Sequence, residues 1–315
     1  MGEQSRSCGV ELSAEEVTRF LKDTLDLDAA GVVHVADGAW SSCFGFAMGD
    51  CDLVIRFGDH AEDYLRDERA SRWASRDLPI PEVTEIGSGL GTEYAISQRA
   101  SGTPLEDNDW AQLGAAIARL LESLRLADLG NHPGWGRWDG SGAAAFQSWR
   151  EYLLSVESDA PQTRTSGWRA KLEQQAPVAF ERFRQWHRLL ETIAVDDVPR
   201  SLVHRDLVNA NVHARKAQIT GVFDWGESIY GDHLYDLAVL DFWSPWLPKA
   251  KPQIARSELD AIWERDGIEI ENRQERFAAC YLHIGLDHIA YNAHRNDWSA
   301  VAAVSARTTE LTDDA

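Results

Sequence analysis

The chain has 315 residues, with 51 acidic against 31 basic side chains and a net charge of −20. That length is enough for two lobes with a core each, and the charge disfavours nucleic acid as a partner, because phosphate binding needs clustered positive charge. No apolar run approaches the roughly 20 residues that cross a bilayer, and the N-terminal segment carries no apolar signal region. We therefore expect a cytoplasmic protein without membrane contact.

The acidic balance also suits a cationic small-molecule substrate, which an acidic cleft attracts and concentrates. Its plainer meaning is solubility alone. The four cysteines lie far apart without a Cys-x-x-Cys pair, which disfavours a zinc site and a disulfide framework. We expect the protein to be a monomer.

The first hundred residues predict a small α+β lobe. Ser13 and Glu16 form a capping-box pattern, and the apolar residues that follow share one helical face. β-Branched and aromatic runs separated by turn residues predict strands, with a hairpin turn at Gly49-Asp50, and the prolines of segment 78–81 end the second helix. The predicted elements are a helix over 13–27, strands over 32–35, 44–48 and 53–57, a helix over 61–75, and strands over 82–86 and 93–98.

Beyond residue 99 the pattern becomes mostly helical. The stretch Ala100-Ser101-Gly102-Thr103-Pro104 is the best candidate for a hinge, so we predict an N-lobe over 1–99, a hinge over 100–104 and a C-lobe over 105–315. Segment 218–223 is strongly strand-like. Period-3.6 patterns predict helices over 110–127, 144–156, 168–193, 274–293 and 299–311.

One segment carries a chemical pattern: His204-Arg205-Asp206, then Asn211, then an apolar strand that ends in Asp224-Trp225. Phosphoryl transfer needs an oriented hydroxyl and Mg²⁺ ions on carboxylate and amide oxygens that offset the developing charge. Asp206 can accept the proton of the attacking hydroxyl, and Asn211 and Asp224 can hold the metal. A lone His-x-Asp or Asp-Trp is common in loops, but their conjunction at this spacing indicates a kinase site. His204 is expected to hold the loop in place.

This core resembles that of the aminoglycoside phosphotransferases and their relatives, the choline kinases and protein kinases. No Ala-Pro-Glu or activation segment follows it; segment 231–238 instead has the Gly-Asp-x-x-x-Asp-Leu-Ala pattern of the antibiotic kinases. The clusters at 78–83, 242–247 and 284–287 are similar to the branch of that family that phosphorylates hygromycin B. The resemblance implies a bilobal protein-kinase-like fold, with a small sheet-containing N-lobe for the nucleotide phosphates and a mostly helical C-lobe for the acceptor.

The resemblance further implies an O-phosphotransferase that uses ATP or GTP with Mg²⁺, acts on a hydroxyl of an aminoglycoside such as hygromycin B or a relative, and confers antibiotic resistance. Arg56 matches the basic residue on the α/β-phosphates, a role that suits the bidentate guanidinium. Its acidic partner is expected at Asp67, with Glu68 as the alternative. Other implied nucleotide contacts are Ser41, Ser42, and the backbone from Gln98 to Ala100. Implied acceptor contacts are Asn209, Glu227, Asp232, Trp243, Trp246 and Asp287.

The two tryptophans have an alternative structural interpretation, and two other functions stay open. Trp243 and Trp246 can equally be core residues, and Asp236 is expected to order the catalytic loop. A kinase for another small amine or sugar, such as choline, homoserine or a glycated amine, would share the same core. An inactive nucleotide-binding module that regulates a partner is the third possibility, which the intact set of Arg56, Asp206, Asn211 and Asp224 disfavours.

Overall fold

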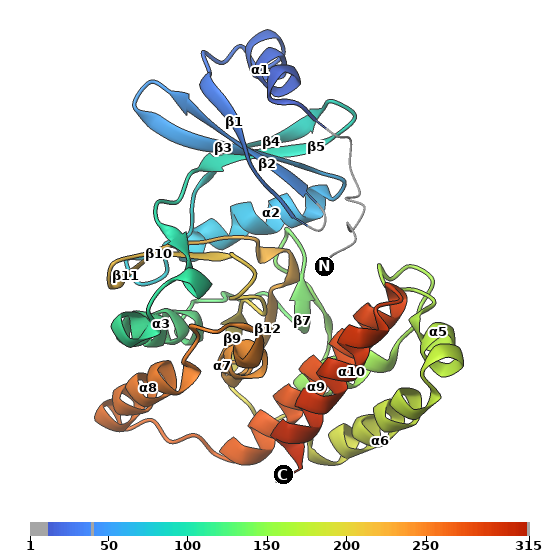
Figure 1. Cartoon of the computed structure of the whole chain (residues 1–315). Helices are drawn as coiled ribbons and strands as arrows, with labels where there is room; N and C mark the ends of the chain where they lie inside the picture. Colours follow the sequence, from blue (N-terminus) through green and yellow to red (C-terminus); the bar gives the residue numbers. More distant parts are fainter. Residues whose placement is uncertain (1–11, 39–40, 314–315) are drawn as a thin grey trace. The chain divides into compact units, whose positions relative to one another are not determined.

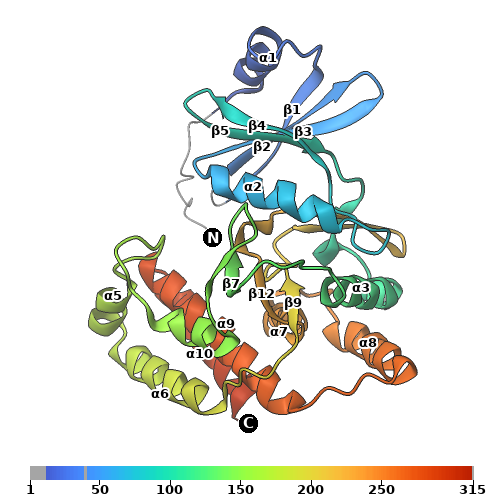
Figure 2. The ribbon, with the colours of Figure 1, turned by 180° about the vertical axis from the view of Figure 1, so that it is seen from behind.

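The computed structural model describes residues 12–38 and 41–313. The chain divides into two compact units, each described here by itself (Figures 1 and 2). Unit 1 comprises the chain up to residue 105 together with segments 139–142 and 211–226, and unit 2 comprises 106–138, 143–210 and 227–315. The strand-like segment around 218–223 therefore belongs to the same unit as the N-terminal sheet.

Unit 1 is built on an antiparallel five-stranded sheet in the order β1-β2-β3-β5-β4. Helices α1 and α2 lie on opposite sides of this sheet (Figures 1 and 2). A second, three-stranded sheet has the order β11-β10-β6. The elements are α1 (Ala14–Asp23), β1 (Ala30–Asp37), β2 (Ser41–Met48), β3 (Cys51–Gly58), α2 (Ala61–Ala70), β4 (Val83–Gly89), β5 (Thr92–Gln98), β6 (Thr103–Pro104), β10 (Val212–Arg215) and β11 (Gln218–Val222).

Helix α1 is capped at its N-terminus and packs on the sheet through its apolar face. The Glu16 amide donates to the Ser13 hydroxyl at 3.2 Å, and the Ser13 amide donates to the Glu16 carboxylate at 2.9 Å, which confirms the predicted capping box. Phe20 packs edge-to-face against Phe57 and Tyr94, with ring centroids 5.9 and 5.2 Å apart. Such aromatic pairs each add about 0.5–1.5 kcal/mol beyond the buried area.

Unit 2 is mostly helical and is organised around α9, which is buried over most of its length and contacts α5, α6, α7 and α10. Helix α3 packs against α8. A four-stranded antiparallel sheet in the order β8-β7-β12-β9 completes the unit. The elements are α3 (Trp110–Arg125), β7 (Trp135–Trp138), β8 (Ala144–Phe146), α4 (Trp149–Leu154), α5 (Trp168–Gln175), α6 (Pro177–Ile193), β9 (Arg200–Val203), β12 (Ile229–Asp232), α7 (Leu234–Trp243), α8 (Pro252–Asp266), α9 (Arg273–His294) and α10 (Trp298–Thr312).

The register of the unit 2 sheet decides which residues meet at one of its ends. Ile229 of the central strand β12 lies opposite Val203 of β9 on one side and opposite Arg137 of β7 on the other. Residues just past the end of β9 and just before the start of β12 are therefore brought together with Arg137.

The fold class predicted from the sequence is confirmed, but two of the predicted helices are not as expected. Segment 144–156 begins as strand β8, in which Ala144 pairs with Trp138, and becomes helical only from Trp149. Segment 168–193 forms two helices that break at Ala176, because Pro177 cannot donate a backbone hydrogen bond to a continuous helix.

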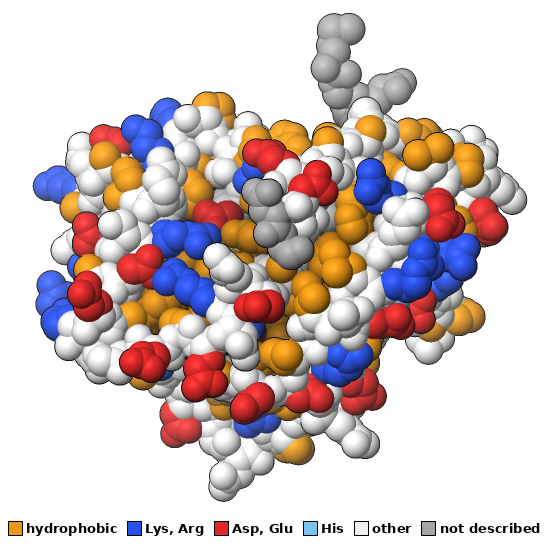
Figure 3. Space-filling view, turned by 90° about the horizontal axis from the view of Figure 1, so that it is seen from below, with side chains coloured by type: hydrophobic (Ala, Val, Ile, Leu, Met, Phe, Trp, Pro, Cys, Tyr) orange, Lys and Arg blue, Asp and Glu red, His pale blue; other side chains and the backbone are white. Residues whose placement is uncertain are grey.

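Acidic and basic side chains are interspersed with apolar ones over the face of the molecule in Figure 3. Within residues 12–38 and 41–313, no helix has both the length and the apolar character that a bilayer crossing requires.

His233, just before α7, is a buried histidine whose two ring nitrogens have no hydrogen-bond partner. Burial lowers its pKa from 6.5 to about 4. Between these two pKa values the unfolded chain binds a proton at His233 and the folded chain does not. The contribution of the neutral His233 to the free energy of unfolding is therefore complete above pH 6.5 and is lost as the pH falls toward 4.

We expect His233→Phe to remove this pH dependence, because phenylalanine has no titrating group. Between about pH 7 and pH 5 the free energy of unfolding of the variant should gain on that of the native chain by about 2 kcal/mol. Urea denaturation at both values measures the gain, independently of any packing cost of the larger ring. A difference that stays constant with pH would show that His233 is not neutral in the fold.

Candidate functional site

The loop after β9 places Asp206 in unit 2 next to two residues that fix its orientation. The Asp206 amide donates to Nδ1 of the buried His204 at 3.2 Å, which leaves the ring proton on Nε2. The side-chain amide of Asn209 donates to Oδ1 of Asp206 at 2.8 Å. His204 thus holds the loop, as expected from the sequence, and Asn209, predicted as an acceptor contact, bonds the carboxylate of Asp206.

Asp236 on α7 holds the backbone of the same loop. Its two carboxylate oxygens accept the backbone amides of His204 and Arg205 at 2.8 and 2.7 Å, and the side chain is buried. Burial raises the pKa of Asp236 to about 7, while the two amide hydrogen bonds and the charge of Arg205 act in the opposite direction. The ordering role predicted for Asp236 is confirmed.

The backbone around these residues adopts an uncommon conformation. Arg205, Asn209, Ala210 and Asp224 have φ between 57° and 76°, and they are four of the nine non-glycine residues with positive φ in the described part of the chain. Non-glycine residues in the left-handed region cost free energy and persist where surrounding contacts enforce them, often at functional sites.

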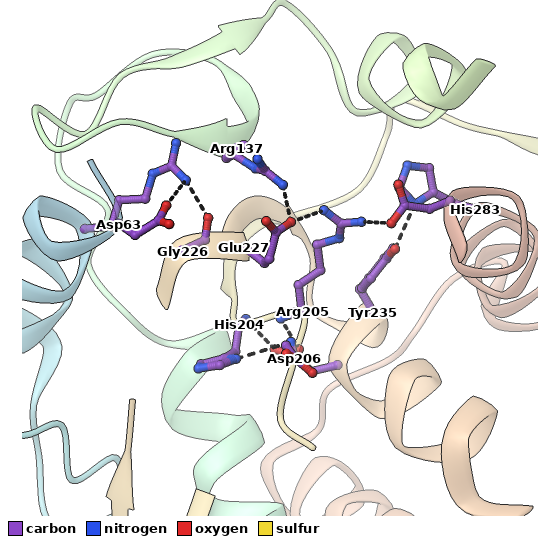
Figure 4. A network of polar contacts seen from close by, with 12 residues as sticks. Asp63, Arg137, His204, Arg205, Asp206, Gly226, Glu227, Tyr235 and His283 are labelled. Atoms are coloured by element: carbon purple, nitrogen blue, oxygen red, sulfur yellow. Dashed lines mark hydrogen bonds and ion pairs between the residues drawn. The ribbon is translucent and has the colours of Figure 1, made fainter. Parts of the chain in front are cut away.

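Arg205 belongs to a network of four charged side chains (Figure 4). Its guanidinium donates to Glu227 at 3.3 Å and also to Asp287 of α9, and Arg137 of β7 donates to Glu227 as well. The sheet register explains the meeting, because Arg205 follows β9, Glu227 precedes β12 and Arg137 lies opposite their ends. Two acidic residues predicted to attract a cationic acceptor are therefore already paired with arginines.

Asp232 corrects the sequence prediction for the acceptor site. The residue is fully buried, and its two oxygens accept hydrogen bonds from Nε and Nη2 of Arg276 at 2.8 and 2.6 Å. A substrate cannot reach a carboxylate that is enclosed in this way. Asp232 forms a structural ion pair between β12 and α9.

The predicted aromatic residues form one cluster in unit 2. Trp243 contacts Trp246, with centroids 5.3 Å apart, and also His288, with centroids 4.6 Å apart. His288 follows Asp287 on α9, so the cluster and the arginine network are adjacent. Trp246 is 44% exposed, which leaves an indole face available for a ligand.

Unit 1 contains the residues predicted to hold the nucleotide phosphates. Arg56 of β3 forms an ion pair with Asp67 of α2, so Asp67 is the acidic partner in the structure and Glu68 is not. The second oxygen of Asp67 accepts the backbone amide of Trp225 at 2.8 Å. Asp67 thereby links the central strand, α2 and the segment that carries Asp224. The Arg56 guanidinium also lies over the ring of Tyr64, 5.2 Å from its centroid.

The predicted metal ligands lie at one end of the β10–β11 hairpin in unit 1. The Phe223 amide donates to the Asn211 carbonyl at 3.0 Å, next to the pairing of Val212 with Val222, so Asn211 and Asp224 flank the same end. Asp224 is exposed there. A carboxylate and an amide oxygen at one position are hard donors of the kind that Mg²⁺ prefers, and the residues therefore fit that ion.

The remaining nucleotide residues have defined but less informative surroundings in unit 1. Ser42 Oγ donates to Asp37 at 2.7 Å, and Ser41 accepts the Gly38 amide on its carbonyl at 2.7 Å. Ala39 and Trp40 of the same predicted loop lie outside the described residues. The Gln98 amide donates to the Glu82 carbonyl at 3.2 Å, so this backbone donor is used within unit 1. Ala100 packs against Gly221 of β11, where an added Cβ would lie 2.3 Å away.

Sequence reasoning missed Arg137 and Arg66. Arg137 lies outside every element and motif predicted from the sequence, and only the strand register brings it to Glu227. Arg66 lies on α2, one turn after Glu62. It donates to the Gly226 carbonyl and lies 3.7 Å from Asp63, and Figure 4 shows both partners. No local signal marks the contact of Arg137 with Glu227 or that of Arg66 with Gly226, because these partners are far away in the chain.

An anchored His-x-Asp loop, a basic strand residue paired with an acidic helix residue, and a hairpin that ends in an asparagine and an aspartate are the features of a kinase-like phosphotransferase. The chain belongs to the phosphotransferase enzyme family, whose model matches residues 47–271. It is a phosphotransferase that acts on a hydroxyl group, which confirms the family resemblance predicted from the sequence.

Individual relatives extend the match over nearly the whole chain. Hygromycin-B 4-O-kinase from Escherichia coli is 29% identical over 290 residues, which are 89% of this chain and 79% of the relative. The crystal structure of aminoglycoside phosphotransferase APH(4)-Ia is 25% identical with a TM-score of 0.80, and covers 96% of this chain and 99% of its own.

Two further structures complete the comparison. A thermostable mutant of APH(4)-Ia, in a ternary complex with AMP-PNP and hygromycin B, is 26% identical with a TM-score of 0.80 and covers 94% of this chain and 97% of its own. Spectinomycin phosphotransferase APH(9)-Ia is 13% identical with a TM-score of 0.61, covers 96% and 95%, and shows the shared fold alone.

Proposed function

We propose that this protein transfers the γ-phosphoryl group of ATP or GTP to a hydroxyl of an aminoglycoside, hygromycin B or a relative, and so confers resistance to that antibiotic. The observation that carries the proposal is the orientation of Asp206, which His204, Asn209 and, through the loop backbone, Asp236 hold in place. The similarity to a hygromycin kinase over most of the chain supports the acceptor class.

In this proposal Asp206 accepts a hydrogen bond from the acceptor hydroxyl and takes its proton as the oxygen attacks the γ-phosphorus. Asn209 keeps the carboxylate turned toward the acceptor. Arg56 binds the nucleotide phosphates through the guanidinium donors that its pair with Asp67 leaves unused, since an arginine has five N–H donors. Asn211 and Asp224 hold Mg²⁺, which when bound offsets charge on the transferring phosphoryl group.

The acceptor contacts follow from the exposed part of the network and the aromatic cluster. Glu227 and Asp287 can accept further hydrogen bonds from ammonium or hydroxyl groups, because an ionised carboxylate has about four acceptor sites. Trp243 and Trp246, whose ring planes are inclined by 56°, supply apolar ring faces on which a sugar ring can pack.

A panel of acceptors tests the proposal directly. We expect the purified protein, incubated with Mg²⁺ and ATP or GTP, to add a single phosphoryl mass to hygromycin B or a related aminoglycoside. Choline, homoserine, a glycated amine and simple sugars serve as the competing acceptors, and mass spectrometry reads the product. Phosphorylation of one of these instead of any aminoglycoside would overturn the acceptor class. Nucleotide binding without any product would favour an inactive module.

A further inference from the structure

The arginine of the His-Arg-Asp segment, Arg205, has no role in the proposed reaction, although it directly precedes the proposed catalytic residue Asp206 in the sequence. The side chain of Arg205 is only 10% exposed, whereas the side chains of its partners Glu227 and Asp287 are each 41% exposed. The arginine therefore bridges two carboxylates that are more exposed to solvent than it is. A cation that arrives from solvent meets the more exposed carboxylates before it meets the arginine.

The charges in this network cancel. Glu227 and Asp287 contribute two negative charges, and Arg205 and Arg137 contribute two positive charges, so the four side chains are neutral together. The neighbouring His283, whose ring bonds Tyr235 at 2.7 Å, adds no charge because burial and then the charge of Arg205 lower its pKa to about 3. These four side chains therefore carry none of the acidic excess of the whole chain.

We propose that Arg205 is a specificity-determining residue, an internal cation that neutralises Glu227 and Asp287 and so favours acceptors whose bound face carries hydroxyl groups and few ammonium groups. This inference rests on the proposed function for its acceptor but on the network alone for its charge. A polyammonium compound must compete with a resident guanidinium for both carboxylates. A hydroxyl-rich face can accept and donate hydrogen bonds without that competition.

The backbone at Arg205 makes a clean test possible. Its φ of 76° lies in the left-handed region that glycine adopts without strain, so Arg205→Gly removes the cation and relieves backbone strain at once. Arg205→Gln removes the charge and keeps a hydrogen-bonding side chain, in case the glycine variant folds poorly. Arg205→Lys keeps the charge. Arg200→Gln removes one positive charge elsewhere in the same unit, on β9, and is the control for net charge.

The experiment measures spermine binding to each variant by calorimetry, which needs neither nucleotide nor turnover. We expect Arg205→Gly and Arg205→Gln to bind spermine about tenfold tighter than the native chain at low salt, because each frees Asp287 from its internal cation and leaves Glu227 with Arg137 as its remaining arginine partner. Adding Asp287→Asn to Arg205→Gly should abolish the gain. At about 1 M salt, where the Debye length is about 3 Å, the difference should vanish.

Equal spermine affinity in the native chain and both neutral variants would overturn the inference, as would an equal gain in Arg200→Gln, which would assign the effect to net charge. A parallel measurement compares the KM of the native chain and Arg205→Gly for hygromycin B and for the more highly charged neomycin. We expect the KM for neomycin to fall relative to the KM for hygromycin B in Arg205→Gly. If no aminoglycoside is phosphorylated by any variant, the proposed function fails while the spermine result still stands.

Discussion

Asp206→Asn should lower the rate of phosphoryl transfer by about a thousandfold or more, within the range lost when a catalytic base is removed. The asparagine keeps an oxygen that can accept the 2.8 Å bond from Asn209, and the backbone bond to His204 does not involve the side chain. The fold should therefore remain intact. Single-turnover kinetics with saturating nucleotide measure the loss, and thermal melting checks the fold.

Asn209→Ala provides the matched control. It removes the donor that orients the carboxylate but leaves the base itself, so we expect a smaller loss, about tenfold. Nucleotide affinity should be unchanged in both variants, because neither residue belongs to unit 1. Turnover near the native rate in Asp206→Asn would remove Asp206 from the role of base.

The sequence could predict what depends on local pattern. The capping box at Ser13, the strands of the first sheet and the catalytic segment all follow from residues close together in the chain. Asp67 and Glu68 could not be separated by spacing, because neighbouring positions on a helix differ only in which face they occupy. The structure puts Asp67 on the face that meets Arg56 and the Trp225 amide.

What failed in the sequence analysis depends on long-range pairing. Segment 144–156 has a helical period, yet its first residues pair with β7, and tertiary pairing outweighs local preference there. The acidic residues near the catalytic loop looked like a cation-attracting rim. Arg137 and Arg276 pair with Glu227 and Asp232, about 40 to 90 positions away in the chain, and Arg205 pairs with Asp287 at a similar separation. No pattern in the sequence predicts such pairs.

Asp236→Ala should destabilise the protein and inactivate it together. The change strands two buried backbone amides, those of His204 and Arg205, and each stranded buried donor costs about 1–3 kcal/mol. We therefore expect a loss of about 2–5 kcal/mol in the free energy of unfolding, measured by urea denaturation. Because the same amides set the position of Asp206, kcat should fall by about a hundredfold even in the fraction that remains folded.

Asp232→Ala separates the two effects, because Asp232 is equally buried, lies four positions earlier and pairs with Arg276 away from the loop backbone. It leaves a buried guanidinium without its carboxylate, so the destabilisation should be at least as large, about 3–5 kcal/mol. Measured at low temperature and corrected for the folded fraction, its kcat should stay within a few-fold of the native value. An equal loss of kcat in both variants would mean that Asp236 acts through overall stability alone. A selective loss in Asp236→Ala ties the catalytic geometry to the two amides it holds.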